Sequence, residues 1–422
     1  MAMWDGGEAD PSAALRALVG AWPTPAYVYD LDQVLRRLDA LRAAFGARFE
    51  ISYAVKANPN RALLAAIAPR VNGFDVSSLA EAERVLEAGG DKPISFTGPG
   101  KRDEELQRFA ALGAGHVVVE SLDEAESLSA IALSHGLPRQ PVILRINPLR
   151  VTRQFGAAMG GASSQFGVDE EAVGAVLDAL AGLEGVSLAG FHCHPATNGL
   201  KAAAVAENLA MMVDLFLRCV AQAGVAEPIL IFGAGFGIPY FEGDEDLDLD
   251  AVASATNPVL DTLRAKPGFG DARFVLELGR WIVGPAGYLL TTVLRTKTSR
   301  GAEIRVCDAG FNAHMAACGM LGGPVRRNWR MLNLTNRDGA IEACDIVGPL
   351  CTALDRVATG IALPEVRKGD VLAILNSGAY GVTASPTRFI SHPEPAEIAL
   401  VAGQAVDVTE SRANWPVEAE AP

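Results

Sequence analysis

The stretch GFDVSSLAEAERVLEA, residues 73–88, joins a short apolar run to a segment whose apolar residues recur at helical spacing. The run Gly73–Ser77 is typical of a buried strand, and Ser78–Ala88 is typical of an amphipathic helix. The same order recurs along residues 51–283, with another clear helical pattern at Asp123–Ser134. Repeated units of this kind favour an α/β fold in which helices cover a parallel sheet.

The number of strand and helix units indicates how the sheet is arranged. Eight β-rich runs are found, at Ile51–Val55, Gly73–Ser77, Ile94–Gly98, His116–Glu120, Val142–Asn147, Ser187–Cys193, Ile229–Gly233 and Phe274–Leu278. Eight units within about 230 residues are typical of a closed (β/α)8 barrel. An open, doubly wound sheet is the alternative.

The pattern changes after residue 283, where β-rich segments replace the long helices. These segments include Tyr288–Thr296, Glu303–Cys307 and Asp370–Asn376. The run Pro25–Tyr29 also reads as a strand and precedes the barrel, so a second domain could use it. We therefore expect residues 1–36 to contribute a strand to a β-rich domain, residues 37–283 to form the barrel, and residues 284–422 to form the β-rich domain.

Composition and charge restrict the classes of partner. The chain has 422 residues, half of them apolar, and its 50 acidic and 36 basic residues give a net charge of -14 without a basic run that could follow phosphates. Nucleic acid is therefore not an expected partner. The apolar stretches stop short of the roughly 20 residues of a membrane helix, and the N-terminus lacks a signal pattern, so we expect a cytoplasmic protein. The six cysteines form no CxxC pair, and neither a zinc site nor any other metal site is expected.

Polar residues gather where the barrel strands are expected to end. The carboxyl ends of barrel strands meet at one mouth. The residues placed there are Lys56, Asp75, His192, His194, Gly233, Ala234, Gly235, Glu277 and Arg280. Each has an ordinary structural explanation by itself, such as a solvated strand end, a buried histidine, a tight turn or an ion pair. Their concentration at one mouth predicts an active site.

These residue types suit one cofactor in particular. A lysine amine forms an imine with an aldehyde. A carboxylate keeps a pyridine nitrogen protonated, so that the ring withdraws electrons. Backbone N–H groups of a glycine-rich loop bind phosphate. The combination predicts pyridoxal 5′-phosphate as the cofactor.

Several motifs also occur in a recognisable order. They are YAVKAN around Lys56, GFDVSS, FTGPGK (96–101), LRINP (144–148), GPLC (348–351) and SGAYG (377–381). In this order they resemble the fold-type III pyridoxal-phosphate decarboxylases, the diaminopimelate, ornithine and arginine decarboxylase family with an alanine-racemase-like barrel. MGGASSQFG (159–167) and RRNW (326–329) are most similar to the branch that serves natural-product and exopolysaccharide pathways.

The resemblance implies a reaction and a role for each matching residue. The reaction is α-decarboxylation of an amino acid or an amino-acid derivative, free or carrier-linked, through an external aldimine and a quinonoid. Lys56 would form the internal aldimine beside Asp75, His194 would stack on the pyridine ring, and Glu277 would pair with the ring nitrogen. The phosphate would be held by Thr197, Gly233, Ala234, Gly235, Arg280 and Tyr380.

The segment GPLCTALD, residues 348–355, resembles one that reaches into the active site of a partner subunit. It implies that Cys351 helps to reprotonate the substrate carbanion, and that the chain forms a head-to-tail homodimer with shared active sites. The residues expected to contact the substrate are Cys351, Asp355, Tyr380, Arg326 and Arg327. The two arginines suit a distal anionic group, and the alternative is that both simply face solvent.

Two other functions would use the same lysine and phosphate-binding groups. One is an amino-acid racemase on the same fold, and the other is a non-catalytic protein that binds pyridoxal phosphate. The GPLC and SGAYG segments favour decarboxylation over racemisation. The expected second β domain distinguishes the chain from small single-barrel binding proteins.

Overall fold

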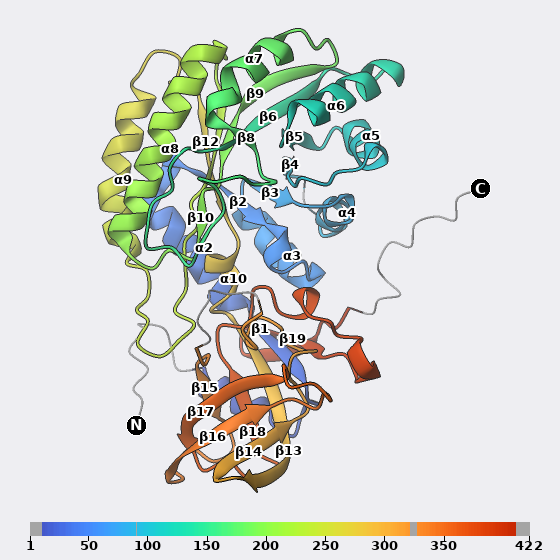
Figure 1. Cartoon of the computed structure of the whole chain (residues 1–422), viewed down its shortest axis with the longest axis vertical. Coiled ribbons are helices and arrows are strands. Elements are labelled where there is room, and N and C mark those ends of the chain that lie inside the picture. Colours follow the sequence, from blue (N-terminus) through green and yellow to red (C-terminus); the bar gives the residue numbers. More distant parts are fainter. Residues whose placement is uncertain (1–10, 90, 321–326, 411–422) are drawn as a thin grey trace, which may run out of the picture. The chain divides into compact units, whose positions relative to one another are not determined.

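The computed structural model describes residues 11–89, 91–320 and 327–410 and divides into two compact units (Figure 1). The described residues of the barrel unit are 35–89, 91–237 and 247–279. Those of the β-rich unit are 11–34, 238–246, 280–320 and 327–410.

The barrel unit contains a closed ring of eight parallel strands, which confirms the (β/α)8 prediction. The order around the ring is β5-β4-β3-β2-β12-β11-β9-β6, and pairing of β5 with β6 closes it. This closure excludes the open doubly wound sheet. The strands are β2 (Glu50–Ala54), β3 (Gly73–Val76), β4 (Ile94–Phe96), β5 (Gly115–Val119), β6 (Gln140–Asn147), β9 (Val186–Cys193), β11 (Ile229–Gly233) and β12 (Arg273–Leu278). They agree with the expected runs to within two residues at each end.

Amphipathic helices connect the barrel strands (Figure 1). Serine side chains cap two of them, since Ser78 Oγ accepts a hydrogen bond from the Glu81 amide and Ser121 Oγ accepts one from the Glu124 amide. Such caps satisfy N–H groups that the first helical turn leaves unpaired. The helices are α2 (Leu31–Phe45), α3 (Arg61–Ile67), α4 (Leu79–Glu87), α5 (Asp103–Leu112), α6 (Leu122–Ser134), α7 (Val173–Ala181), α8 (Ala202–Ala223) and α9 (Leu249–Arg264).

The loops of the barrel unit add three short strands, and the barrel has an apolar core. Strand β8 (Val168–Asp169) pairs with β6, and β7 (Ala157–Ala158) pairs with β10 (Ala196–Thr197). Buried Val118, Ile143, Ile231 and Val275 come from four different strands and pack together. This layer supports the polar residues at the carboxyl ends of the strands, where a barrel places its active site.

The β-rich unit takes a strand from the N-terminal segment. Strand β1 (Ala26–Asp30) pairs antiparallel with β13 (Gly287–Ser299) and parallel with β19 (Ala396–Val401). The sheet order is β17-β16-β14-β13-β1-β19-β20, and β18 pairs with β13 and β15. The other elements are α1 (Ser12–Leu18), α10 (Arg280–Val283), β14 (Ala302–Cys307), β15 (Met331–Asn333), β16 (Ile341–Val347), β17 (Arg356–Pro364), β18 (Val371–Ile374) and β20 (Gln404–Asp407).

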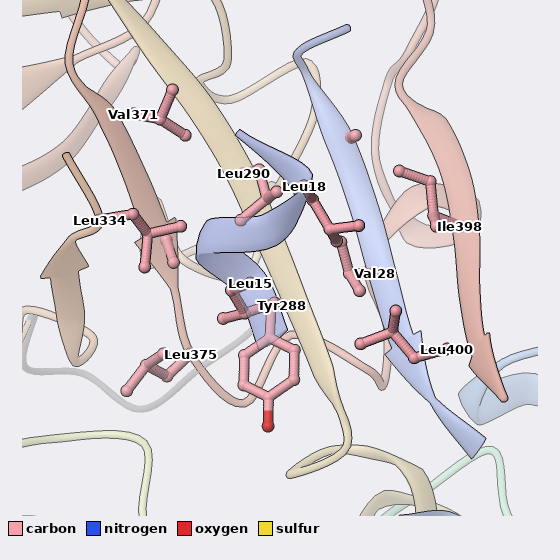
Figure 2. Close-up of a cluster of buried hydrophobic side chains, with 12 residues drawn as sticks. Leu15, Leu18, Val28, Tyr288, Leu290, Leu334, Val371, Leu375, Ile398 and Leu400 are labelled. Atoms are coloured by element: carbon pink, nitrogen blue, oxygen red, sulfur yellow. The ribbon is translucent and has the colours of Figure 1, made fainter. Parts of the chain in front are cut away.

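A compact apolar cluster holds this sheet to helix α1 (Figure 2). Leu15 and Leu18 of α1 lie against Val28 of β1 and Leu290 of β13. Burial of such side chains is the main favourable contribution to folding. The N-terminal segment therefore belongs to the core of the β-rich unit. None of the helices in the described ranges is both long and apolar enough to cross a membrane.

One loop groups differently from the boundaries expected from sequence. Residues 238–246 follow β11 and lie within the expected barrel range 37–283, but by their contacts they join the β-rich unit. The Arg330 amide donates a hydrogen bond to the Tyr240 carbonyl at 3.0 Å, and Asn376 Nδ2 donates one to the Pro239 carbonyl at 2.6 Å. The β-rich unit also resumes at Arg280 rather than at residue 284. Hydrogen bonds to residues that lie far along the chain therefore decide to which unit this loop belongs.

Candidate active site

Lys56 lies at the mouth of the barrel beside two buried carboxylates. It occupies the single turn Val55–Ala57 that directly follows β2. Its Nζ is 3.3 Å from Asp75 Oδ2 and 3.6 Å from Glu277 Oε1. The carboxylates come from β3 and β12, the two neighbours of β2 in the ring. The Lys56 side chain is 38 % exposed, so its amine can be reached while the negative charge around it is buried.

Thr97 holds the first of these carboxylates. Its Oγ1 donates a hydrogen bond of 2.5 Å to Asp75 Oδ1, which leaves Oδ2 to face Lys56. Burial raises the pKa of Asp75, and the nearby charge of Glu277 raises it further. Thr97 was absent from the predicted site residues, although it lies within the FTGPGK motif directly after β4.

His192 holds the second carboxylate. Its Nε2 is 3.1 Å from Glu277 Oε2, and both side chains are buried. Burial by itself would raise the pKa of Glu277, but the Lys56 charge and the His192 hydrogen bond outweigh it and hold the pKa well below its usual value. Glu277 is therefore ionised. His192 was expected at this strand end, without a predicted role.

His194 presents a neutral ring next to Glu277. Its Nδ1 lies 4.0 Å from Glu277 Oε1 and has no hydrogen-bond partner among the described residues. Burial lowers the pKa of His194 to about 3, which keeps the imidazole uncharged at neutral pH. The side chain is 18 % exposed, so part of the ring remains available for stacking on a planar ligand.

The glycines after β11 permit close approach of neighbouring groups. A Cβ added at Gly233 would lie 2.2 Å from His194 Nδ1, and one added at Gly235 would lie 2.1 Å from the Ala196 carbonyl oxygen. Gly235 also has a φ of +66°, a conformation that favours glycine. The Gly199 amide donates a hydrogen bond of 2.9 Å to the Gly235 carbonyl. This bond joins the loop that carries Thr197 to the Gly233–Gly235 loop.

Arg280 and Tyr380 meet within the β-rich unit. The Arg280 guanidinium carbon lies 4.7 Å from the centre of the Tyr380 ring, and Nη1 donates a hydrogen bond of 2.5 Å to the Tyr240 hydroxyl. Within the described part of the chain, Arg280 Nε has no hydrogen-bond partner. Tyr240 was not predicted, since a tyrosine after a glycine loop carries no distinctive signal. The Arg280 guanidinium thus has an N–H group available to donate a hydrogen bond, and guanidinium groups commonly bind phosphate.

Cys351 and Asp355 share a loop but differ in exposure. Cys351 is exposed, whereas Asp355 is buried. The two Asp355 carboxylate oxygens accept hydrogen bonds of 2.6 Å from the amides of Phe311 and Leu350. In this structure Asp355 therefore anchors the loop that displays Cys351. Its contact with substrate stays a prediction.

Only one of the two arginines proposed for substrate binding lies within the described residues. Arg326 lies outside the described residues. Arg327 Nη1 is 2.9 Å from Asp244 Oδ1, and its Nη2 donates a hydrogen bond of 3.0 Å to the Glu242 carbonyl. The Arg327 charge is thus already compensated by a carboxylate, although its side chain is 45 % exposed.

The groups in the barrel mouth fit pyridoxal 5′-phosphate. A reachable amine, an ionised buried carboxylate, a neutral ring with an unpartnered nitrogen and a glycine-lined loop are the donor set that this cofactor requires. His192, His194 and Glu277 also place three donor atoms within 4.8 Å of one another, which a metal ion could use. The Lys56 ammonium, 3.6 Å from Glu277, would repel a cation there. These groups therefore suit pyridoxal 5′-phosphate better than a metal ion.

Comparisons with known proteins point to the same cofactor. Residues 31–284 match the family model of the pyridoxal-binding domain of pyridoxal-dependent decarboxylases. The chain is 31% identical over 391 residues to the L-glutamyl-[BtrI acyl-carrier protein] decarboxylase of Niallia circulans, covering 92% of this chain and 91% of that protein. It is 34% identical over 405 residues to the diaminopimelate decarboxylase of Methanothermobacter thermautotrophicus, covering 94% and 91%.

A solved structure supports the same relationship. The diaminopimelate decarboxylase of Helicobacter pylori in complex with L-lysine superposes with a TM-score of 0.82 at 27% identity, covering 94% of this chain and 96% of that one. The likeness extends over the barrel and the β-rich domain. It confirms the predicted fold, and the family match confirms the predicted cofactor. The chain belongs to the family of pyridoxal-dependent decarboxylases.

Proposed function

We propose that this enzyme removes the α-carboxylate from an amino-acyl group that is linked to a carrier. The observation that carries the reaction is the exposed Lys56 amine, 3.3 Å from Asp75 and 3.6 Å from the ionised Glu277, at the mouth of a barrel. The observation that supports the substrate class is the 31% identity, over nine-tenths of both chains, to a decarboxylase whose substrate is a carrier-bound glutamyl group.

The proposed cofactor contacts follow from the donor types. Lys56 binds the cofactor aldehyde, Glu277 holds a proton at the pyridine nitrogen, and His194 lies on the ring face. Thr197, the Gly233–Gly235 loop, Arg280 and Tyr380 hold the phosphate. Asp75 and Glu277 keep the Lys56 amine in place through their charge. The bound cofactor supplies an electron-withdrawing ring, which accepts the electron pair left when carbon dioxide departs.

The chain's own residues perform the remaining chemistry. The barrel mouth orients the α-carboxylate, so that the bond to the α-carbon breaks and carbon dioxide leaves. The Cys351 thiol then donates a proton to the α-carbon, in place of the lost carboxylate. The loop anchored by Asp355 leaves Cys351 exposed, as a group that acts on another subunit's substrate must be.

The substrate proposal depends more on the carrier than on Arg327. Because Asp244 already pairs with Arg327, this residue supplies little uncompensated positive charge for an anionic side chain. A carrier-linked substrate gains affinity from parts of the carrier that are remote from the reacting carbon. Such remote binding free energy can be used to orient the reacting group.

A carbon-dioxide release assay tests the substrate class. We expect release from an L-glutamyl thioester of an acyl-carrier protein, with kcat/KM at least about tenfold above that for free lysine or ornithine. The panel includes free diaminopimelate, arginine, glutamate and aspartate as controls. Rapid release from free diaminopimelate, lysine or ornithine would contradict a carrier-linked substrate. No release from any substrate, with the cofactor visibly bound, would favour the racemase alternative.

A second part of the proposal is a homodimer with shared active sites. If Lys56 and Cys351 of one site come from different subunits, Lys56→Ala and Cys351→Ala are each inactive as pure homodimers. A mixture of the two restores one complete site per mixed dimer, and we expect about a quarter of wild-type activity for random association. Sedimentation measures the assembly and carbon-dioxide release measures the activity. A mixture as inactive as its components would exclude shared sites.

A cytoplasmic location is also part of the proposal. It is supported by the six cysteines, all of which are free thiols. Free thiols are typical of reducing compartments. Cell fractionation with an antibody against the chain tests this location, and recovery in an extracytoplasmic fraction would contradict it.

A further inference from the structure

His192 makes a single well-defined polar contact in the interior of the barrel. Its Nε2 is 3.1 Å from Glu277 Oε2, and its side chain is 1 % exposed. Its other nitrogen, Nδ1, is buried and has no hydrogen-bond partner in the described ranges. Among the described residues, the hydrogen-bond partner of the ring is thus Glu277, which the proposed function places on the cofactor.

The direction of this hydrogen bond follows from the charge of Glu277. An ionised carboxylate can only accept, so His192 Nε2 carries the proton and donates it. Hydrogen bonds to a charged acceptor are stronger than neutral ones. The bond uses Oε2, whereas Oε1 of the same carboxylate lies 3.6 Å from Lys56 Nζ. His192 therefore fixes the rotation of the carboxylate about its last bond.

The strand register explains why the two residues meet although 85 positions separate them. His192 lies on β9 in register with Ile231 of β11, and Glu277 lies on β12 in register with Gly233 of β11. The two side chains therefore reach towards each other across β11. At the level of Glu277, β11 has Gly233, and the absence of a side chain there leaves room for the His194 ring.

We infer that His192 is a positioning residue, which holds the Glu277 carboxylate with one oxygen towards Lys56 and keeps it aligned for the cofactor ring. This inference rests on the proposed function. Through this bond His192 contributes to cofactor affinity and to turnover without touching the cofactor's reacting atoms. It is distinct from His194, whose ring is part of the proposed cofactor surface.

The test compares His192→Leu, which removes the donor, with His192→Gln, which keeps an N–H group. For His192→Leu we expect the Kd of pyridoxal 5′-phosphate to rise at least about tenfold, the visible spectrum of the bound cofactor to change, and kcat to fall more than KM changes. His192→Gln should recover a large part of these losses. Apo-enzyme titration, absorbance spectra and steady-state kinetics provide the readouts.

His116 provides a matched control. It is also a buried barrel histidine, and its Nε2 is 2.7 Å from Ser95 Oγ on the adjacent strand. His116→Leu also removes a buried hydrogen bond of a histidine. We expect the cofactor Kd of this variant to stay within about threefold of the wild-type value and its cofactor spectrum to be unchanged, because the substitution lowers only the stability of the fold. If His192→Leu behaves like His116→Leu, or if His192→Gln is as impaired as His192→Leu, the inference is wrong.

A double-mutant cycle separates positioning from a general structural effect. In a Glu277→Gln background, His192→Leu should cause little further change in cofactor Kd, because the residue through which His192 acts has already been altered. Additive effects would overturn the inference, and His192→Ala, which also removes the donor, replaces His192→Leu in the cycle if the leucine variant fails to fold. Absence of any cofactor spectrum in the wild-type enzyme would instead reject the proposed function itself.

Discussion

Replacement of Lys56 by alanine is expected to abolish the visible absorbance of covalently held cofactor and to lower turnover by about 10⁴-fold or more. No other group in the barrel mouth offers a reachable amine at the position between Asp75 and Glu277, within the residues that the structure describes. The change also leaves those two buried carboxylates without their cation. Spectra and carbon-dioxide release measure the two effects separately.

Two further variants isolate the covalent role from the electrostatic one. Lys56→Arg keeps a positive charge near Asp75 and Glu277 but cannot form the covalent link, so it should fold well and remain inactive. Lys92→Ala is the control, since Lys92 is a partly exposed lysine 4.0 Å from the exposed Asp91. It should match the wild type. A Lys56→Ala enzyme that retains both the cofactor spectrum and turnover would disprove the assignment.

Replacement of Gly233 by valine should also cause a large loss. Its Cβ would lie 2.2 Å from His194 Nδ1 and 2.6 Å from His194 Cβ, so the imidazole must leave its present position. The same residue ends β11, where the proposed phosphate loop begins. We expect the cofactor Kd to rise by about 100-fold, as a steric cost of about 3 kcal/mol implies. Titration of apo-enzyme with pyridoxal 5′-phosphate measures this change.

Gly270→Val is the matched control for this glycine. Gly270 also lies in the barrel unit, and an added Cβ there would meet nothing within 4 Å. We expect its cofactor affinity to equal that of the wild type. Equal affinities for Gly233→Val and Gly270→Val would show that the close approach of His194 to β11 has no part in cofactor binding.

The barrel could be predicted from sequence because its signals are local. Each strand is a short apolar run, and the helix that follows has its own periodicity, so the eight strands were located to within two residues. The N-terminal strand was harder, since its partners β13 and β19 lie more than 250 residues away along the chain. The second β-rich region suggested a use for it, and in the structure β1 pairs with both β13 and β19.

The site was only partly predictable for a related reason. Lys56, Asp75, His194 and Glu277 each follow or end a strand, and barrel strands end at one mouth. Thr97 and His192 are equally close to the site, but their importance comes from a hydrogen bond to another strand. No property of a single segment distinguishes such a residue from a buried neighbour.

Asp355 makes contacts that its sequence motif does not indicate. Its place in the GPLCTALD segment predicts contact with substrate, and that contact stays a prediction. What the structure adds is that its carboxylate accepts hydrogen bonds from Leu350 and from Phe311, 44 residues away. The loop of residues 238–246 is similar, since Arg330 and Asn376 attach it to the β-rich unit. In both cases hydrogen bonds with residues far along the chain hold the segment in its place.

The amino-acid sequence by itself determined the alternation of strands and helices, the location of Lys56 at the end of a barrel strand, and the cofactor class. These depend on local periodicity and on residue chemistry, both of which are present in the unfolded chain. Only the tertiary structure decided which carboxylate oxygen faces Lys56, which residues hold Asp75 and Glu277, and that Arg327 is already paired. Such facts require atoms from separate strands to meet within about 3 Å, and this distance is set by barrel closure and strand register rather than by any one segment.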